Sequence, residues 1–276
     1  MKYGFVLPFG DARAAAEAAQ VAEAAGWDGF FVWEPVWGID AWVSLTAAAM
    51  LTERIKLGTM LSPVSRMRPW KLASEAATLD NLSGGRVVLA VGLGAIDTGF
   101  TAFGEVTDRK QRAELLDEGL AIMTGLWAGQ PFSFTGKHYT VHPTEFMVPP
   151  PPVQQPHIPI WVVGAWPSPK SMVRAACYDG IIPSVVPPGE PARQATPAEV
   201  QAIKAQVIAM REPGLPYEII VEGETPGDDP VQAAARVAPW RDAGATWWIE
   251  ASWNLQPTAG QEPILNRLRQ GPPRVA

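Results

Sequence analysis

Short apolar runs alternate with longer segments of helical periodicity along nearly the whole chain. Apolar runs of a few residues are typical of strands, and apolar positions three or four residues apart are typical of helices. Strands are predicted at 3–7, 29–33, 55–61, 87–91, 158–163, 180–184, 217–221 and 246–251. Helices are predicted at 12–25, 41–52, 69–82, 108–127, 168–177, 197–211, 230–243 and 262–268.

The predicted strands and helices form eight consecutive pairs. Strict alternation predicts a parallel sheet, and eight units in a chain of this length predict closure into a (β/α)8 TIM barrel. A doubly wound open sheet is the alternative. We expect one domain over residues 1–276, with 128–157 as a loop insertion after the fourth helix. Within it, alternating polarity at 132–148 predicts a hairpin that lies over the top of the barrel.

The composition agrees with a large buried core, since 47% of the residues are hydrophobic and 18% are charged. The net charge of −6, without a basic run, argues against nucleic-acid and anionic membrane partners. The single cysteine, Cys177, excludes an internal disulfide. No apolar stretch reaches the roughly 18 residues of a membrane span, and the first strand leaves no room for a signal peptide. We therefore expect a cytoplasmic protein.

The stretch 79–97 combines a helix end, a tight turn and a buried strand. Gly84 and Gly85 allow the turn because glycine reaches positive φ. Gly92-Leu93-Gly94 follows at the carboxyl end of the strand, where α/β proteins bind ligands. A dinucleotide fingerprint is not formed, because Asp97 stands where a third glycine or alanine belongs.

Motifs of several other enzyme classes are missing from the sequence. There is no P-loop, HExxH or GxSxG motif. His138 and His142 lie four residues apart, but on a predicted hairpin they would not share a helical face. No metal site is predicted.

A better place for an anionic group is the segment 163–171, where a strand meets a helix. Gly164 would let backbone N–H groups approach a phosphate, and the helix begins at once with Ser168 as its predicted cap. An ordinary strand-to-helix turn without a ligand is the alternative.

Many short segments along the chain are unspecific when taken singly, but their combination in this order is specific for one protein family. They are AEAAGWD at 22–28, IKLGT at 55–59, ATLDNLSGGR at 77–86, GLG at 92–94, FGE at 103–105, Arg112 with Glu118, LWAG at 126–129, GKHY at 136–139, PHIPIW at 156–161, AA at 175–176 and DG at 179–180. Together they resemble the bacterial luciferase-like flavin-dependent monooxygenases and F420-dependent oxidoreductases. The resemblance covers most of residues 1–183, and the rest matches only in general form.

The resemblance implies a luciferase-like barrel with a flavin at the carboxyl ends of its strands. It places a non-proline cis peptide of the third strand at Met60-Leu61, behind the flavin ring. Arg112 would be a charged partner for the cofactor phosphate, with an exposed helical charge as the alternative. The cofactor-binding residues implied are Met60, Leu61, Gly92, Leu93, Arg112, Gly164, Ala165, Trp166 and Ser168.

The segment after the second strand departs from the family. Many members carry an acidic residue followed by a catalytic histidine here, whereas this chain has Glu34-Pro35. Proline has no proton to give, so Glu34 is the candidate catalytic base, or else a buried carboxyl satisfied by backbone. The chain has 12 tryptophans, most of them expected in the core. Trp33, Trp37 and Trp253 are candidates for an apolar substrate pocket, whose walls we expect from 33–40 and 128–157.

These observations predict a flavin-dependent oxidoreductase. The preferred hypothesis is a monooxygenase that uses reduced FMN and O2 on a small apolar molecule, with a separate flavin reductase as a partner. The alternative is F420-dependent hydride transfer, for which Arg66, Arg68 and Lys71 offer only a modest basic rim. A flavin-binding protein without turnover is a further alternative. The resemblance also implies a homodimer.

Overall fold

The computed structural model describes residues 1–143, 147–187 and 189–275, and in it eight parallel strands close into a barrel. The strand order is β10-β11-β1-β2-β3-β4-β7-β8, and β10 also pairs with β8. The strands are β1 (Lys2–Leu7), β2 (Gly29–Val32), β3 (Lys56–Pro63), β4 (Val87–Gly92), β7 (Ile160–Trp166), β8 (Gly180–Val185), β10 (Glu218–Gly223) and β11 (Trp247–Ala251). This confirms the (β/α)8 prediction and excludes the open sheet.

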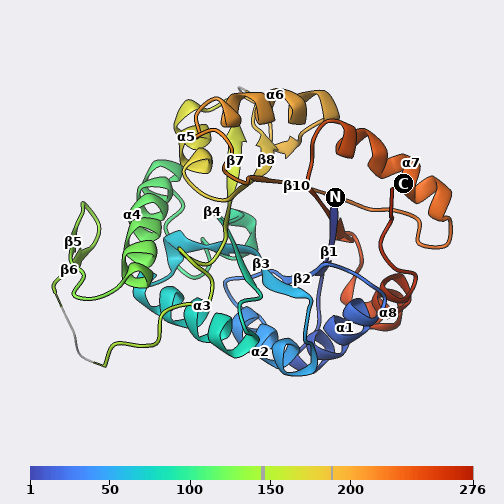
Figure 1. The fold of residues 1–276 in the computed structure, drawn as a ribbon, viewed down its shortest axis with the longest axis horizontal. Helices are drawn as coiled ribbons and strands as arrows, with labels where there is room; N and C mark the ends of the chain where they lie inside the picture. Colours follow the sequence, from blue (N-terminus) through green and yellow to red (C-terminus); the bar gives the residue numbers. More distant parts are fainter. Residues whose placement is uncertain (144–146, 188, 276) are drawn as a thin grey trace.

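In the described part of the chain, eight α-helices surround the strands (Figure 1). They are α1 (Ala12–Ala24), α2 (Ala41–Leu51), α3 (Pro69–Ser83), α4 (Arg109–Ala128), α5 (Pro169–Ala176), α6 (Pro197–Ile208), α7 (Pro230–Asp242) and α8 (Glu262–Arg269). Local signals begin several of them. The Asp40 side chain accepts a hydrogen bond from the Val43 N–H, and Thr196 and Glu199 form a capping box. Each predicted helix is therefore present, with ends shifted by at most a few residues.

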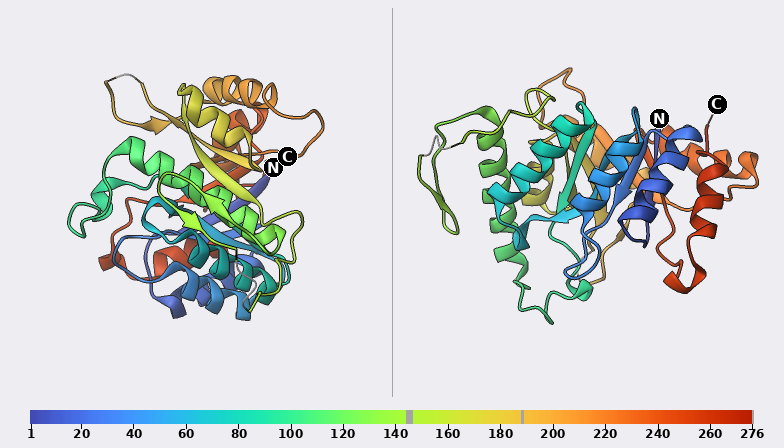
Figure 2. Two further views of the ribbon diagram at one scale, coloured as in Figure 1. Left: turned by 90° about the vertical axis from the view of Figure 1, so that its left-hand side faces the viewer. Right: turned by 90° about the horizontal axis from the view of Figure 1, so that it is seen from below.

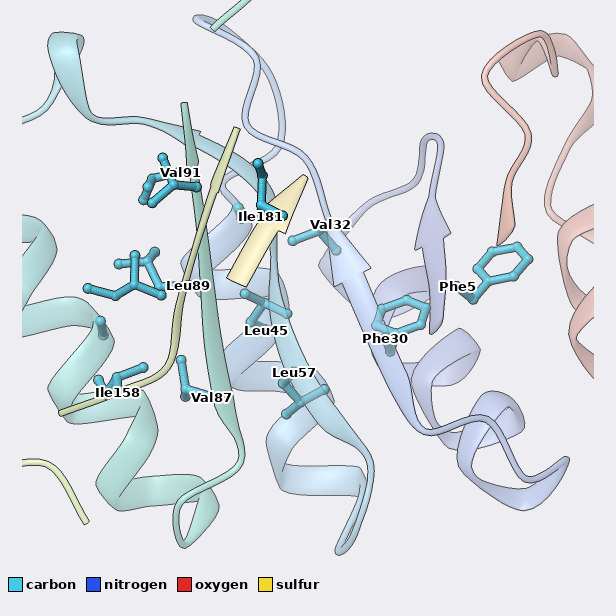
Figure 3. Packing of buried hydrophobic residues seen from close by; sticks show 14 of the residues in the cluster. Phe5, Phe30, Val32, Leu45, Leu57, Val87, Leu89, Val91, Ile158 and Ile181 are labelled. Carbon is cyan, nitrogen blue, oxygen red and sulfur yellow. The ribbon is translucent and has the colours of Figure 1, made fainter. Parts of the chain in front are cut away.

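The larger part of the core lies between the barrel wall and the helices. In β4, Val87, Leu89 and Val91 are fully buried on the helix-facing side, as Figure 3 shows together with Leu45 of α2 and Ile158. Val88 and Ala90 belong instead to the cluster inside the barrel. A continuous apolar strand is thus buried on both faces, which is the behaviour expected of a parallel barrel strand.

Three large aromatic side chains fill the interior of the barrel. The ring centroids of Trp161 and Trp247 are 5.1 Å apart, and that of Phe31 lies 5.5 Å from Trp161 and 6.1 Å from Trp247. Two glycines make room for them. A Cβ atom on Gly29 would come within 2.7 Å of Phe31, and one on Gly180 within 2.7 Å of Trp161. These distances are shorter than van der Waals contact, so a side chain at either glycine would displace an aromatic ring.

The segment 79–97 has a structural role at the amino end of β4. Gly84 and Gly85 adopt φ values of 68° and 84°, as predicted for the turn. Arg86 is buried, and its guanidinium donates hydrogen bonds to the carbonyl oxygens of Ser83, Ile55, Ala49 and Thr52 and to the Thr52 hydroxyl. It thereby satisfies the carbonyl groups at the end of α2, and its burial lowers the pKa of the guanidinium.

The predicted position of the hairpin is wrong. Two short strands, β5 (Phe134–Thr135) and β6 (Thr140–Val141), do form a hairpin, but it lies outside α4 and not over the barrel (Figures 1 and 2). The Glu118 carboxylate on α4 accepts hydrogen bonds from the N–H groups of Lys137, His138 and Tyr139, which fixes the turn to the helix. Residues 144–146 of the predicted hairpin segment lie outside the described residues.

The sequence pattern also misplaced several strand ends by two or three residues and missed one strand. β7 continues to Trp166, three residues beyond its predicted end. The short strand β9 (Arg193–Gln194) pairs antiparallel with the carboxyl end of β8 and was not predicted. In the part of the chain that the structure describes, no helix is long and apolar enough to cross a membrane.

The Arg86 contacts predict a large effect on stability. Arg86→Leu should lower the free energy of unfolding by about 3 kcal/mol, because it leaves several buried carbonyl groups without a donor. Urea denaturation followed by circular dichroism measures the change. Arg54→Leu is the control, because the Arg54 side chain is 72% exposed and should contribute less than about 1 kcal/mol. Equal effects of the two substitutions would contradict the assignment.

Candidate active site

A cavity of about 1240 Å³ opens at the carboxyl ends of the barrel strands. Side chains of β3, β7, β8 and β10, the segments after β2, β4 and β11, and the first turns of α4 and α5 line it. This is the end of a parallel barrel where ligands bind. None of the described residues of 128–157 reaches it, so the expectation that this segment forms a pocket wall is wrong.

The floor of the cavity is apolar. Met60 and Leu61 of β3, Val163 of β7 and Ile182 of β8 line it, and Met60, Leu61 and Ile182 also belong to the cluster inside the barrel or pack against it. The Met60-Leu61 peptide bond is cis, as predicted. Gly92 lies beneath this surface, since a Cβ atom there would meet Leu61 at 3.0 Å and Val163 at 3.1 Å.

Glu34 lies in the cavity directly after β2 and Trp33. Its Oε2 atom is buried and has no hydrogen-bond partner among the described residues. Burial raises the pKa of the carboxyl group to about 7, although the Ser62 hydroxyl and the positive Arg66 oppose the shift. The carboxyl is therefore not satisfied by backbone. It can exchange a proton near neutral pH, as a general acid or base must.

Two of the three candidate tryptophans lie together beside Glu34. The rings of Trp33 and Trp253 meet edge to face with centroids 6.5 Å apart, and both line the cavity. The Trp33 indole N–H donates to the Pro8 carbonyl oxygen at 2.8 Å, which fixes that ring. Trp37 is 81% exposed and borders a separate cavity of about 310 Å³ on the other side of Trp33.

Arg112 reaches the cavity from the first turn of α4 and is 5% exposed. Its Nη1 atom donates to the carbonyl oxygens of Leu93 and Gly94, both at 2.9 Å. Its Nε atom is buried without a partner, and no described carboxylate forms an ion pair with it. Burial lowers the pKa of the guanidinium. Arg112 is thus not an exposed helical charge but a buried cation with donor capacity left for an anion.

The start of α5 brings only part of the predicted phosphate segment to the cavity. Ala165 and Ser168 line it, and the Ala165 N–H donates to the Ser171 hydroxyl oxygen at 2.8 Å. Ser168 occupies the N-cap position, but its side chain does not cap the helix. Its hydroxyl therefore has no internal role as a helix cap.

Gly164 and Trp166 lie on the opposite side of β7 from the cavity. A Cβ atom on Gly164 would collide with Ile181 at 2.4 Å, and the Trp166 indole N–H donates to the Gln206 side chain on α6. Neither residue lines the cavity. The alternation of side chains along a strand explains this, because Trp161 and Val163 face inward and residues 164 and 166 must face the helices.

Glu222 is a cavity residue that the sequence reasoning missed. It lies near the carboxyl end of β10, two residues after the inward-facing Ile220. The Gln194 side-chain amide donates to its carboxylate at 3.4 Å, and burial raises the pKa of the group. An acidic residue at the end of a predicted strand was the available signal, as it was for Glu34.

The luciferase-like monooxygenase family matches residues 1–270 of the sequence. The chain belongs to this family.

Two relatives are similar to part of the chain. An uncharacterized protein of Mycobacterium tuberculosis is 35% identical over 190 residues, which cover 60% of this chain and 65% of that protein. The F420-dependent glucose-6-phosphate dehydrogenase of Nocardia farcinica is 37% identical over 133 residues, 46% of this chain and 37% of that enzyme. The matched part therefore spans less than two thirds of the length of either relative.

Two luciferase-like solved structures cover almost the whole barrel. Monooxygenase RslO1 from Streptomyces bottropensis superposes with a TM-score of 0.78 at 22% identity, over 98% of this chain and 97% of that one. The oxygenating constituent of 3,6-diketocamphane monooxygenase from Pseudomonas putida, solved with FMN, gives 0.74 at 16% identity, over 100% and 99%. The likeness shows that the luciferase-like fold is shared.

The basic residues that line the cavity are not the three that the sequence indicated. Arg66 donates to the carbonyl oxygens of Glu34 and Pro35, Arg68 stacks on Trp70, and Lys71 pairs with Glu75; none of these cations lines the cavity. The cations that line it on the α4 and α5 side are Arg109, Lys110, Arg112, Lys170 and Arg174.

The raised pKa of Glu34 predicts a pH-dependent cost to stability. The folded protein holds the proton up to about pH 7 and the unfolded chain only to about pH 4.5, so the free energy of unfolding falls as pH rises through this window. Above pH 7 the cost is at most about 3 kcal/mol. Glu34→Gln should therefore be more stable than the wild type at pH 8, with little difference at pH 4.5.

Urea denaturation at several pH values measures this effect. Glu17→Gln on the exposed face of α1 is the matched control and should show no such pH-dependent gain. A Glu34→Gln difference that is the same at pH 4.5 and pH 8 would show that the carboxyl is not held protonated.

Proposed function

We propose that this protein is a flavin-dependent oxidoreductase, and that it acts as a monooxygenase with reduced FMN and O2 on a small apolar organic molecule. The supporting observation is the cavity itself. It joins a buried, unpaired cation, Arg112, to an apolar floor and to a carboxyl group, Glu34, that titrates near neutral pH. Family membership supports the same reaction class.

The residues present fit a phosphorylated flavin. Arg112 offers a buried Nε–H that has no partner among the described residues, and Ser168 offers a hydroxyl that does not cap its helix. Both line the cavity near the start of α5, where backbone N–H groups favour an anion. These groups would hold the phosphate, and Met60 and Leu61 would lie against the apolar ring system.

A reduced flavin supplies the electrons for the reaction when it is bound. The protein's own residues do the rest. Trp33, Trp253 and the apolar floor exclude water and give the substrate an apolar surface. Glu34 holds or accepts a proton at its Oε2 atom, which no internal group occupies. Pro35 offers no proton, so Glu34 is the group at this position that performs proton transfer.

F420-dependent hydride transfer is the second candidate. Arg109, Lys110 and Lys170 line the cavity, and none of them forms an ion pair with a described carboxylate. Such a rim suits a cofactor with a long anionic tail, and the Nocardia farcinica relative is named for F420 dependence. A flavin-binding protein without turnover is the third candidate, supported by Pro35 in place of a proton donor.

The partners follow from the preferred function. The segment 92–97 lacks a dinucleotide fingerprint, which supports a separate flavin reductase as the source of reduced FMN. A homodimer is supported by α2, which contains no charged residue and exposes apolar side chains. Val43 is 60% exposed, Met50 67% and Leu51 47%. Such an uncharged helix face is typical of an interface.

The phosphate assignment predicts the effect of Arg112→Gln. The dissociation constant for FMN should rise at least tenfold, because a charge-assisted hydrogen bond is lost. Quenching of flavin fluorescence measures it, with Arg13→Gln on the exposed face of α1 as the control. Since Arg112 also holds Leu93 and Gly94, melting temperatures are compared, and Arg112→Lys should recover part of the affinity. A change within twofold would contradict the assignment.

The interface assignment predicts the effect of charges on α2. The double substitution Val43→Glu and Met50→Glu should convert a dimer to a monomer, because carboxylates would be buried without partners. Light scattering after size-exclusion chromatography measures the mass. Val231→Glu is the control, because Val231 is 82% exposed on α7, away from α2. A wild-type protein that is monomeric at micromolar concentration would contradict the proposal.

A further inference from the structure

Charges of opposite sign line opposite arcs of the cavity. Five of the cations belong to α4 and α5, which follow β4 and β7, whereas Arg193 of β9 lies next to Gln194, the partner of Glu222, and is paired with Glu199. Glu34 follows β2 and Glu222 lies on β10, and on the side of the barrel away from α4 and α5 only β11 and β1 separate these two strands. The cavity is therefore electrically polar along its length.

The other carboxyl groups that line the cavity have partners within the chain, and Asp108 accepts a hydrogen bond from the Gln111 N–H as the N-cap of α4. On the cationic arc, Asp117 is paired with Arg174, and Glu114 with Lys137 and His138. Glu34 and Glu222 form no ion pair with any described residue. Arg193 precedes Gln194, which donates a hydrogen bond to Glu222. Its guanidinium is paired with Glu199.

The space between Glu34 and Glu222 is bounded by aromatic rings. Trp253 follows β11 and Trp33 follows β2, so both lie on the same arc as the two carboxyl groups. Trp253 also donates a hydrogen bond that stabilises the Glu222 carboxylate. The 42% exposure of Trp253 leaves ring surface available to a ligand.

We propose that this arc binds an organic amine, with Glu222 and Glu34 as the partners of its ammonium group and Trp33 and Trp253 against its apolar part. An ammonium group would supply each carboxylate with an ion-pair partner that no described residue provides, through charge-assisted hydrogen bonds. Indole faces add attraction for a cation. The inference rests on the proposed function and changes its substrate from a purely apolar molecule to one whose apolar body carries an amine, with Glu222 as a substrate-positioning residue.

The test compares benzylamine with benzyl alcohol, which share an aromatic body and differ in charge. Isothermal titration calorimetry of the purified full chain should give an affinity at least tenfold higher for the amine. Glu222→Gln should abolish that preference while the affinity for the alcohol changes little. Glu224→Gln is the matched control, because Glu224 is exposed two residues further on and does not line the cavity.

Two results would overturn the proposal: equal wild-type affinity for amine and alcohol, or an unchanged amine preference in Glu222→Gln. If that variant fails to fold, the wild-type comparison and Glu34→Gln, which should also weaken the preference, decide instead. FMN and F420 titrations of the wild type distinguish failure of this inference from failure of the proposed function. A protein that binds a cofactor without preferring the amine keeps the proposed function and loses this inference, whereas one that binds neither cofactor loses the proposed function.

Discussion

The packing of Phe31, Trp161 and Trp247 inside the barrel is the constraint on which the rest of the structure depends. A closed ring of eight parallel strands leaves an interior that side chains must fill. Here the rings fill it from β2, β7 and β11, and inward-facing glycines such as Gly29 and Gly180 provide the space. Because the interior is solid at this level, the open space lies beyond it, at the carboxyl ends where Met60, Val163 and Ile182 form the cavity floor.

The same alternation of inward and outward positions decides which residues reach the cavity. Along β10 it turns Ile220 and Glu222 inward, and along β7 it turns Gly164 and Trp166 toward the helices. The cavity acquires its polarity in this way, with unpaired carboxyl groups on one arc and Arg112 on the other. Holding Glu34 buried costs stability above neutral pH. That cost is typical of a site arranged for chemistry rather than for folding.

The sequence predicted the barrel well, because the signals that define it are local. Apolar runs and the glycine turn at Gly84-Gly85 act within a few residues, and the structure confirms both. The hairpin was misplaced because its position depends on a distant side chain, Glu118. Gly164 was misread because its lack of a side chain serves packing against Ile181, which only the fold reveals. Glu222 was missed because the predicted strand ended at residue 221, one residue before it, and because its partner, Gln194, lies on a strand too short to predict.

The central claim is that the barrel cavity holds a flavin-type cofactor by its phosphate. The most direct measurement is the absorbance spectrum of the purified protein, before and after incubation with FMN or F420 and removal of excess, with mass spectrometry of the cofactor released on denaturation. We expect one bound cofactor per chain, identified by its mass as FMN or as F420. Protein that retains neither cofactor after incubation with each would contradict the claim.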